Sequence, residues 1–172
     1  RENNPSRELY RQSLQNEYLY RLWIEILAQN NDDDALRSLA THLQNTIASG
    51  LIETRAGHAL VALTHYELGE REAATMIWRP LRKNGNEPFQ RELTLILEDD
   101  EELRSQAAQI LIRVSGDFFH LRRASLFFHA NKDSKGFQRS LETVDEAFPS
   151  NPLRAEISFH QCFGSKNYER AL

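Results

Sequence analysis

The stretch ATMIW, from Ala74 to Trp78, places a small side chain four residues before a bulky apolar one. The same pairing recurs along the chain at Ala35 and Leu39, Ala107 and Leu111, and Ser140 and Val144, with Ala171 at the next position. The small residues are separated by 39, 33, 33 and 31 positions. A period near 34 residues is typical of stacked helix–turn–helix repeats. In such repeats a small side chain lets two helices approach closely, and the bulky one fills the adjoining groove.

The composition predicts an ordinary soluble, folded segment. The 172 residues are 40% hydrophobic and 27% charged, which suits a chain long enough to bury a continuous core. A net charge of −4 offers no basic surface for nucleic acid, so we expect no nucleic-acid partner. No run approaches the ~18 consecutive apolar residues of a membrane helix, and we expect no membrane insertion. The sequence leaves the compartment, cytoplasmic or periplasmic, and the oligomeric state open.

Helix start and stop signals divide the chain into about ten helices. Pro80 lies late in the fourth of these and should bend or fray it, because proline removes one backbone hydrogen bond. No segment alternates with a period of two, so we expect no strand. The expected helices cover approximately residues 6–29, 33–49, 54–68, 70–84, 88–97, 100–115, 117–130 and 134–148, with a ninth from Asn151 and a truncated tenth from Asn167.

Residues 56–88 carry a set of residues at characteristic spacings: Val61-Ala62, His65-Tyr66, Gly69, Ala74, Trp78 and Pro88. This stretch resembles a tetratricopeptide repeat (TPR). Weaker matches run over residues 124–152 and 155–172, whereas residues 1–55 and 89–123 keep the period but few signature residues. The resemblance implies an all-α fold, a right-handed α-α superhelix or TPR-like solenoid of about ten antiparallel helices. Other two-helix repeats of similar period also fit the pattern.

The repeats predict the domain organisation. We expect residues 1–172 to form a single TPR-like repeat domain, excerpted from a longer protein because the chain starts at Arg1 and ends inside a helix. The expected divisions are a degenerate repeat over 1–55, the best repeat over 56–88, a degenerate repeat over 89–123, a repeat over 124–152 and a truncated repeat over 153–172.

In the TPR family, the first helix of each repeat lines a concave groove that takes a peptide or a partner helix. Carried onto this chain, the resemblance implies a groove lined by Ala59, Leu63, Tyr66, Glu67, Arg122, Ser125, His129 and Lys132. Chaperone-binding members hold a carboxylate with a lysine and asparagine clamp. Here Ala59, Leu63, Ser125 and His129 occupy the clamp positions, so we expect another protein or peptide, acidic ones included, but not a chaperone tail.

No residue pattern indicates catalysis, and we expect neither a cofactor nor a metal. His58 and His65 can share a helical face, but no third ligand follows at a recognised spacing. Cys162 has no base beside it that a helix would orient correctly, which favours a buried structural thiol. The acidic runs 32–34 and 98–102 lack the spacing of a calcium loop and suit helix N-termini instead.

Two further features concern the surface. Basic residues gather at Arg79, Arg82 and Lys83 and again at Arg113, Arg122 and Arg123; these are solvated helix ends or a strip for an acidic partner. Adjacent rings at Phe118-Phe119 and Phe127-Phe128 point in different directions. We therefore expect the core to take them, with a seam or groove position for one ring of each pair as the alternative.

The sequence therefore predicts a non-catalytic protein–protein interaction scaffold that binds a peptide or partner protein along a concave helical groove. The alternative is a structural spacer or self-association module of a larger assembly, export machine or enzyme. For the groove, we expect Tyr66, Arg122, His129 and Lys132 to be accessible on one concave surface, with Trp78 and Leu111 buried behind it.

Overall fold

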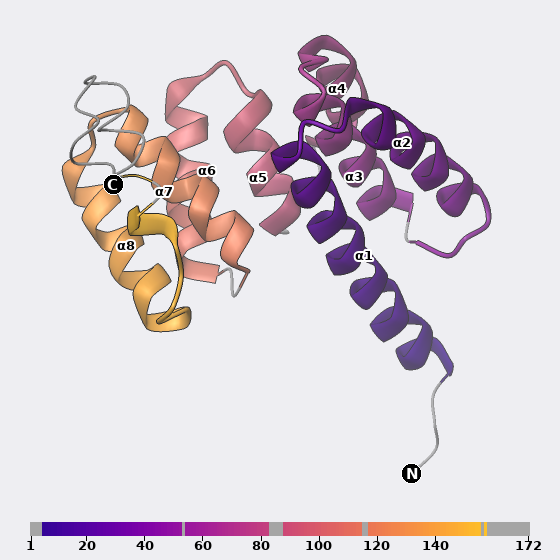
Figure 1. Cartoon of the computed structure of the whole chain (residues 1–172), viewed down its shortest axis with the longest axis horizontal. Helices are drawn as coiled ribbons and strands as arrows, with labels where there is room; N and C mark the ends of the chain where they lie inside the picture. The colour runs from indigo at the N-terminus through magenta and orange to yellow at the C-terminus, as the bar shows by residue number, and fades with distance from the viewer. Residues whose placement is uncertain (1–4, 53, 83–87, 115–116, 156, 158–172) are drawn as a thin grey trace. The chain divides into compact units, whose positions relative to one another are not determined.

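A computed structural model describes residues 5–52, 54–82, 88–114, 117–155 and 157 (Figure 1). Within these ranges the chain forms eight helices and no strand, which confirms the all-α expectation. The helices are α1 (Pro5–Gln29), α2 (Asp33–Ala48), α3 (Thr54–Glu67), α4 (Arg71–Trp78), α5 (Pro88–Leu97), α6 (Glu101–Val114), α7 (Phe118–Ala130) and α8 (Ser134–Ala147).

The chain divides into two compact units, one ending at Asp99 and the other beginning at Asp100. Unit 1 contains α1 to α5, and unit 2 contains α6 to α8. Each unit has buried apolar side chains of its own, centred on residues such as Leu60 and Trp78 in unit 1 and Leu121 and Val144 in unit 2.

In unit 1, α3 packs against each of the other four helices. Its sequence explains this position, because every residue from Ala59 to Thr64 is buried, so the helix offers an apolar surface on all sides. Gly57 brings α3 close to α2, since a Cβ there would overlap the side chain of Ile47. The much longer α1 contacts α2 and α3, and Figure 1 shows its N-terminal half extending beyond them.

In unit 2, α7 packs against both α6 and α8. This packing buries one of the two phenylalanine pairs. Phe127 and Phe128 are both buried, and their rings meet edge to face with centroids 5.7 Å apart. Arg104 of α6 lies over the Phe127 ring at 5.1 Å, whereas Phe128 lies against Gly136 of α8. Phe118 and Phe119 are only partly buried.

The small-then-bulky pairs lie on α2, α4, α6 and α8. Ala74, Ala107 and Ser140 have no exposed surface, and their partners Trp78, Leu111 and Val144 are buried as expected. The exception is Ala35 on α2, which is only partly buried although Leu39 beside it is covered.

Aspartates cap four helices, and two of them, Asp32 and Asp100, belong to the acidic runs. The side chains of Asp32, Asp100, Asp117 and Asp133 each accept a hydrogen bond from a backbone N–H in the first turn of α2, α6, α7 and α8. These caps satisfy donors that the helix leaves without internal partners. The acidic runs are thus explained by helix initiation.

Two helix ends differ from the expectations. The first helix begins at Pro5, one residue before the expected start. The fourth helix ends at Trp78 instead of continuing to about residue 84. Pro80 lacks the N–H that would bond one turn back, and the chain turns there with Leu81 N–H donating to the Trp78 carbonyl at 2.8 Å.

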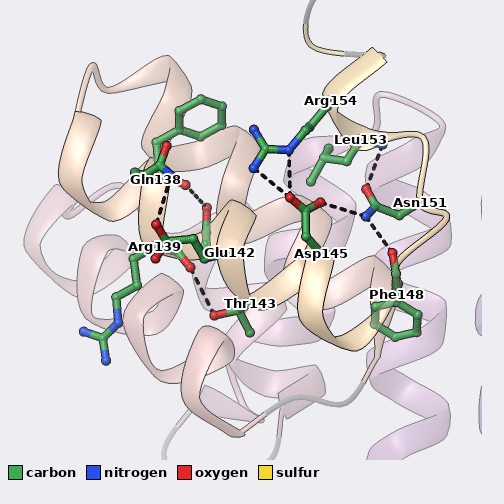
Figure 2. Close-up of polar contacts among 11 residues, drawn as sticks. Gln138, Arg139, Glu142, Thr143, Asp145, Phe148, Asn151, Leu153 and Arg154 are labelled. Atoms are coloured by element: carbon green, nitrogen blue, oxygen red, sulfur yellow. Dashed lines mark hydrogen bonds and ion pairs between the residues drawn. The ribbon is translucent and has the colours of Figure 1, made fainter.

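The segment after α8 is tied back to that helix by side chains (Figure 2). Asp145 accepts hydrogen bonds from Arg154 Nε at 2.7 Å and from Asn151 Nδ2 at 3.1 Å. Asn151 also caps the short helical turn that begins at Leu153, whose N–H donates to Asn151 Oδ1 at 3.0 Å. The expected ninth helix begins as anticipated, while the expected tenth, from residue 167, lies outside the described residues.

Candidate functional site

The groove residues expected in unit 1 lie on α3 and are mostly covered. Tyr66 and Glu67 are partly buried, and the Tyr66 ring packs against the core of the unit. Ala59 and Leu63 are 1% and 0% exposed, so neither can line a groove. Their burial follows from the central position of α3, which is covered by α1, α2, α4 and α5.

The groove residues expected in unit 2 lie on α7 and in the turn after it. Arg122 and His129 are partly buried, and the His129 ring lies 5.0 Å from that of Phe137. Lys132 is exposed in the turn, with a positive φ of 57°. Ser125 is a wrong assignment, because it has no exposed surface and its hydroxyl donates to the Leu121 carbonyl at 2.9 Å. It lies on a side of α7 that the neighbouring helices cover.

An exposed apolar face on α1 is the most prominent surface feature that the sequence reasoning missed. Leu19, Trp23 and Ile26 follow one another at helical spacing and are 59%, 51% and 47% exposed. Tyr18 beside them is 52% exposed. Tyr18 and Ile26 also lie at helical spacing from each other. On the other side of the helix, the structure buries Arg21, Ile24 and Glu25.

Two shallow hollows accompany this face, which we call the α1 face (Tyr18, Leu19, Trp23, Ile26). One has a volume of about 410 Å³ and is lined by Leu19, Tyr20, Leu22, Trp23 and Ile26. The other, of about 360 Å³, lies between α1 and α2 and is lined by Trp23, Leu27, Ala35, Ser38, Leu39 and His42. At its edge, the hydroxyl of Tyr20 and Nε2 of His42 are 2.9 Å apart, a hydrogen bond that links the two helices.

A buried ionic cluster explains why the opposite face of α1 is polar. The Arg21 guanidinium donates to Glu25 on the same helix and to Glu92 on α5, and all three residues are at most 5% exposed. The ring of Phe89 lies 5.9 Å from the guanidinium carbon. This cluster fastens α1 to α5 inside unit 1. With all three side chains buried, the cluster packs between the two helices.

The sequence offers His58, His65 and Cys162 as candidate metal or catalytic residues. His58 is exposed, and His65 Nδ1 lies 2.7 Å from a carboxylate oxygen of Glu70. Hydrogen bonds from His65 and from Arg37 lower the pKa of the Glu70 carboxyl. Among the described residues, no group of three or more His, Cys, Asp or Glu side chains is arranged to hold a metal ion. Cys162 lies outside these residues.

The clustered basic residues noted in the sequence differ in their exposure and in their contacts. Arg82 pairs with Glu98 at 3.0 Å and lies over the Trp78 ring at 6.0 Å, so it closes the end of α4. Arg79 and Arg113 are exposed, Arg123 is partly buried, and Lys83 lies outside the described residues. None of the described helices has the length and apolar character needed to cross a membrane.

Comparison with protein families, curated proteins and solved structures finds no match to this chain. The TPR resemblance therefore depends on the quoted residues alone, and the superhelical arrangement of the repeats remains a prediction. The residues that define a candidate site are those of the α1 face and its two hollows.

Proposed function

We propose that this chain is a non-catalytic protein-interaction scaffold made of TPR-like helix pairs. The observation that carries the proposal is the α1 face, on which aromatic and aliphatic side chains follow one another with about half of each exposed. Contiguous exposed apolar surfaces of this kind mark interaction sites. Tryptophan and tyrosine are also the residues that contribute most to binding at protein interfaces.

The shape of the α1 face suits a helix or an extended apolar segment. The hollows of about 410 Å³ and 360 Å³ offer space for large side chains on either side of Trp23. An amphipathic helix binds such a surface through apolar residues spaced three and four apart. The partner is thus a protein whose contact surface is apolar where it meets Trp23 and Ile26.

The concave groove of the TPR resemblance is the second part of the proposal. In a right-handed superhelix of about ten helices, Tyr66, Glu67, Arg122, His129 and Lys132 would face a common groove. Support comes from the partial or full exposure of these five side chains. An acidic peptide would suit the cationic members in unit 2.

Self-association is the second candidate function, and Ala35 favours it. The equivalent residues Ala74, Ala107 and Ser140 are fully covered, whereas Ala35 is partly open and lines the hollow beside Trp23. Among the described residues, no helix covers this side of the α1 and α2 pair, which resembles a repeat seam. A second copy of the chain could occupy that side and form a spacer or assembly module.

Site-specific photo-crosslinking tests both candidates. A benzoylphenylalanine replaces Leu19 or Trp23 in the full protein inside the cells that express it, and the exposed His58 on α3 is the matched control position. We expect the same partner protein from both α1 positions and none from position 58. Crosslinks between two copies would select self-association, whereas equal products at all three positions, or none at α1, would contradict the proposal.

A further inference from the structure

Unit 2 contains a hollow that none of the predicted groove residues lines. Its volume is about 340 Å³, which is at the lower end of the range for ligand pockets. It lies where α6 and α8 meet over the end of α7, and its main lining residues are Gln109, Ile112, Phe128, Lys135, Gly136 and Arg139.

The floor of this hollow is apolar. Phe128 and Ile112 contribute to the lining although only 1% and 7% of their surfaces are exposed. Gly136 lets the ring lie against the first turn of α8, because a Cβ at this position would be 2.5 Å from Phe128 Cδ1. Because Phe128 is almost fully covered, Ile112 is the part of the floor that an incoming apolar side chain can touch.

The rim of the hollow carries positive charge. Lys135 and Arg139 are four residues apart on α8, so they lie on the same side of the helix, and both are exposed. In the part of the chain that the structure describes, neither has an ion-pair partner, and Figure 2 shows the Arg139 side chain directed away from the contacts along α8. Asp133, the one carboxylate of the lining, accepts a hydrogen bond from Gly136 N–H at 2.9 Å and so caps α8.

We propose that this hollow binds a peptide segment of a partner protein in which an apolar side chain lies beside an aspartate or glutamate. The apolar side chain would lie against Ile112 and the aliphatic parts of Lys135 and Arg139, where burial removes its surface from water. The neighbouring carboxylate would reach Arg139, whose guanidinium can donate two parallel hydrogen bonds to it, with Lys135 adding a second positive charge. The argument is charge complementarity over an apolar floor, and it does not depend on the α1 face.

The test uses synthetic peptides of defined sequence and nuclear magnetic resonance of the whole chain. The probe is acetyl-DDLLDD-amide, and the comparison peptides are acetyl-DDGGDD-amide, without the apolar side chains, and acetyl-KKLLKK-amide, with the charge reversed. We expect the probe to shift the Gly136 amide and the Ile112 methyl signals, with a Kd of about 1 mM or tighter at low salt. Both comparison peptides should bind at least tenfold more weakly.

Variants locate the binding. The double substitution Lys135→Glu and Arg139→Glu should weaken the probe at least tenfold, whereas Arg79→Glu on exposed surface in unit 1 should leave its Kd unchanged. Arg139→Gln, which removes one charge without adding another, gives an intermediate loss and guards against misfolding of the double variant. Higher salt should also weaken binding, because exposed charges are screened.

Three results would overturn the proposal. The first is the absence of shifts at Gly136 and Ile112. The second is a Kd for the peptide without leucines that equals that of the probe, which would mean that the hollow binds only the negative charges. The third is a shift of the same signals with protein concentration alone, which would make a second copy the occupant. The photo-crosslinking experiment tests the α1 face and not this hollow. Its failure would therefore not contradict peptide binding in unit 2.

Discussion

At the scale of single residues, Ala74 shows how little space the helix pairs leave. It has no exposed surface and lies on α4, which packs against α3 and α5. Ala74→Leu adds three carbon atoms to this seam and should lower the free energy of unfolding by ~1–3 kcal/mol. Urea denaturation measures the change, and Ala48→Leu on the exposed end of α2 is the matched control. Equal stability of the two variants would mean that Ala74 is not at a close approach.

The helical pattern of the sequence does not indicate that Arg21 contributes to the stability of the fold. It is 1% exposed between Glu25 and Glu92, so its removal leaves two carboxylates buried together without the guanidinium. Arg21→Met should lower the free energy of unfolding by ~3–5 kcal/mol, because an uncompensated buried charge is costly. Arg37→Met, which breaks the exposed pair with Glu70, should have a much smaller effect in the same denaturation assay. A similar loss in both variants would contradict this account of the cluster.

At the scale of elements, the end of α8 depends on one carboxylate. Hydrogen bonds from Arg154 and then Asn151 hold the pKa of Asp145 below its usual value. A carboxyl whose pKa is lower in the folded state stabilises the protein above its unfolded pKa of about 3.9. That contribution disappears as the pH falls through the lower pKa of the folded state.

Asp145→Asn should therefore destabilise the protein at neutral pH, and its difference from wild type should shrink at an acidic pH below about 3.9. Denaturation of both proteins at the two pH values measures this. Glu142→Gln is the control, because the Glu142 carboxylate accepts a hydrogen bond from Gln138 in the described part of the chain. A difference between wild type and Asp145→Asn that persists unchanged at the acidic pH would show that the ionised carboxylate is not the cause.

The element scale also shows where periodicity misleads. The residues from Tyr18 to Leu27 are apolar at eight of ten positions, so several faces of α1 fit a helical spacing equally well. The presence of Glu92 on α5 selects the face with Arg21, since the guanidinium gains a buried carboxylate partner there. Trp23 and Ile26 then remain outside.

At the scale of the whole molecule, each of the two units has core residues of its own. We therefore expect the stability of one unit to be partly independent of the stability of the other. The core around Leu60 lies in unit 1, and the core around Leu121 lies in unit 2. Compact units with core residues of their own can open separately, so a local defect need not spread along the chain. Ala74→Leu should therefore speed amide hydrogen exchange in α3 and α4 and leave α7 protected. Hydrogen exchange with mass spectrometry reads both units at once, and parallel loss of protection in α7 would show a single cooperative unit.

The sequence by itself determined the helical fold class, most helix boundaries and the burial of Ala74, Ala107 and Ser140. These features are local, because capping aspartates and the alternation of small and bulky residues act within one or two turns. Only the tertiary structure decided that Ser125 is covered, that Arg21 is buried and that the α1 face is open. Each of these outcomes depends on which neighbouring helix covers a given side, and contacts between residues far apart in the chain leave no periodic signal in the sequence.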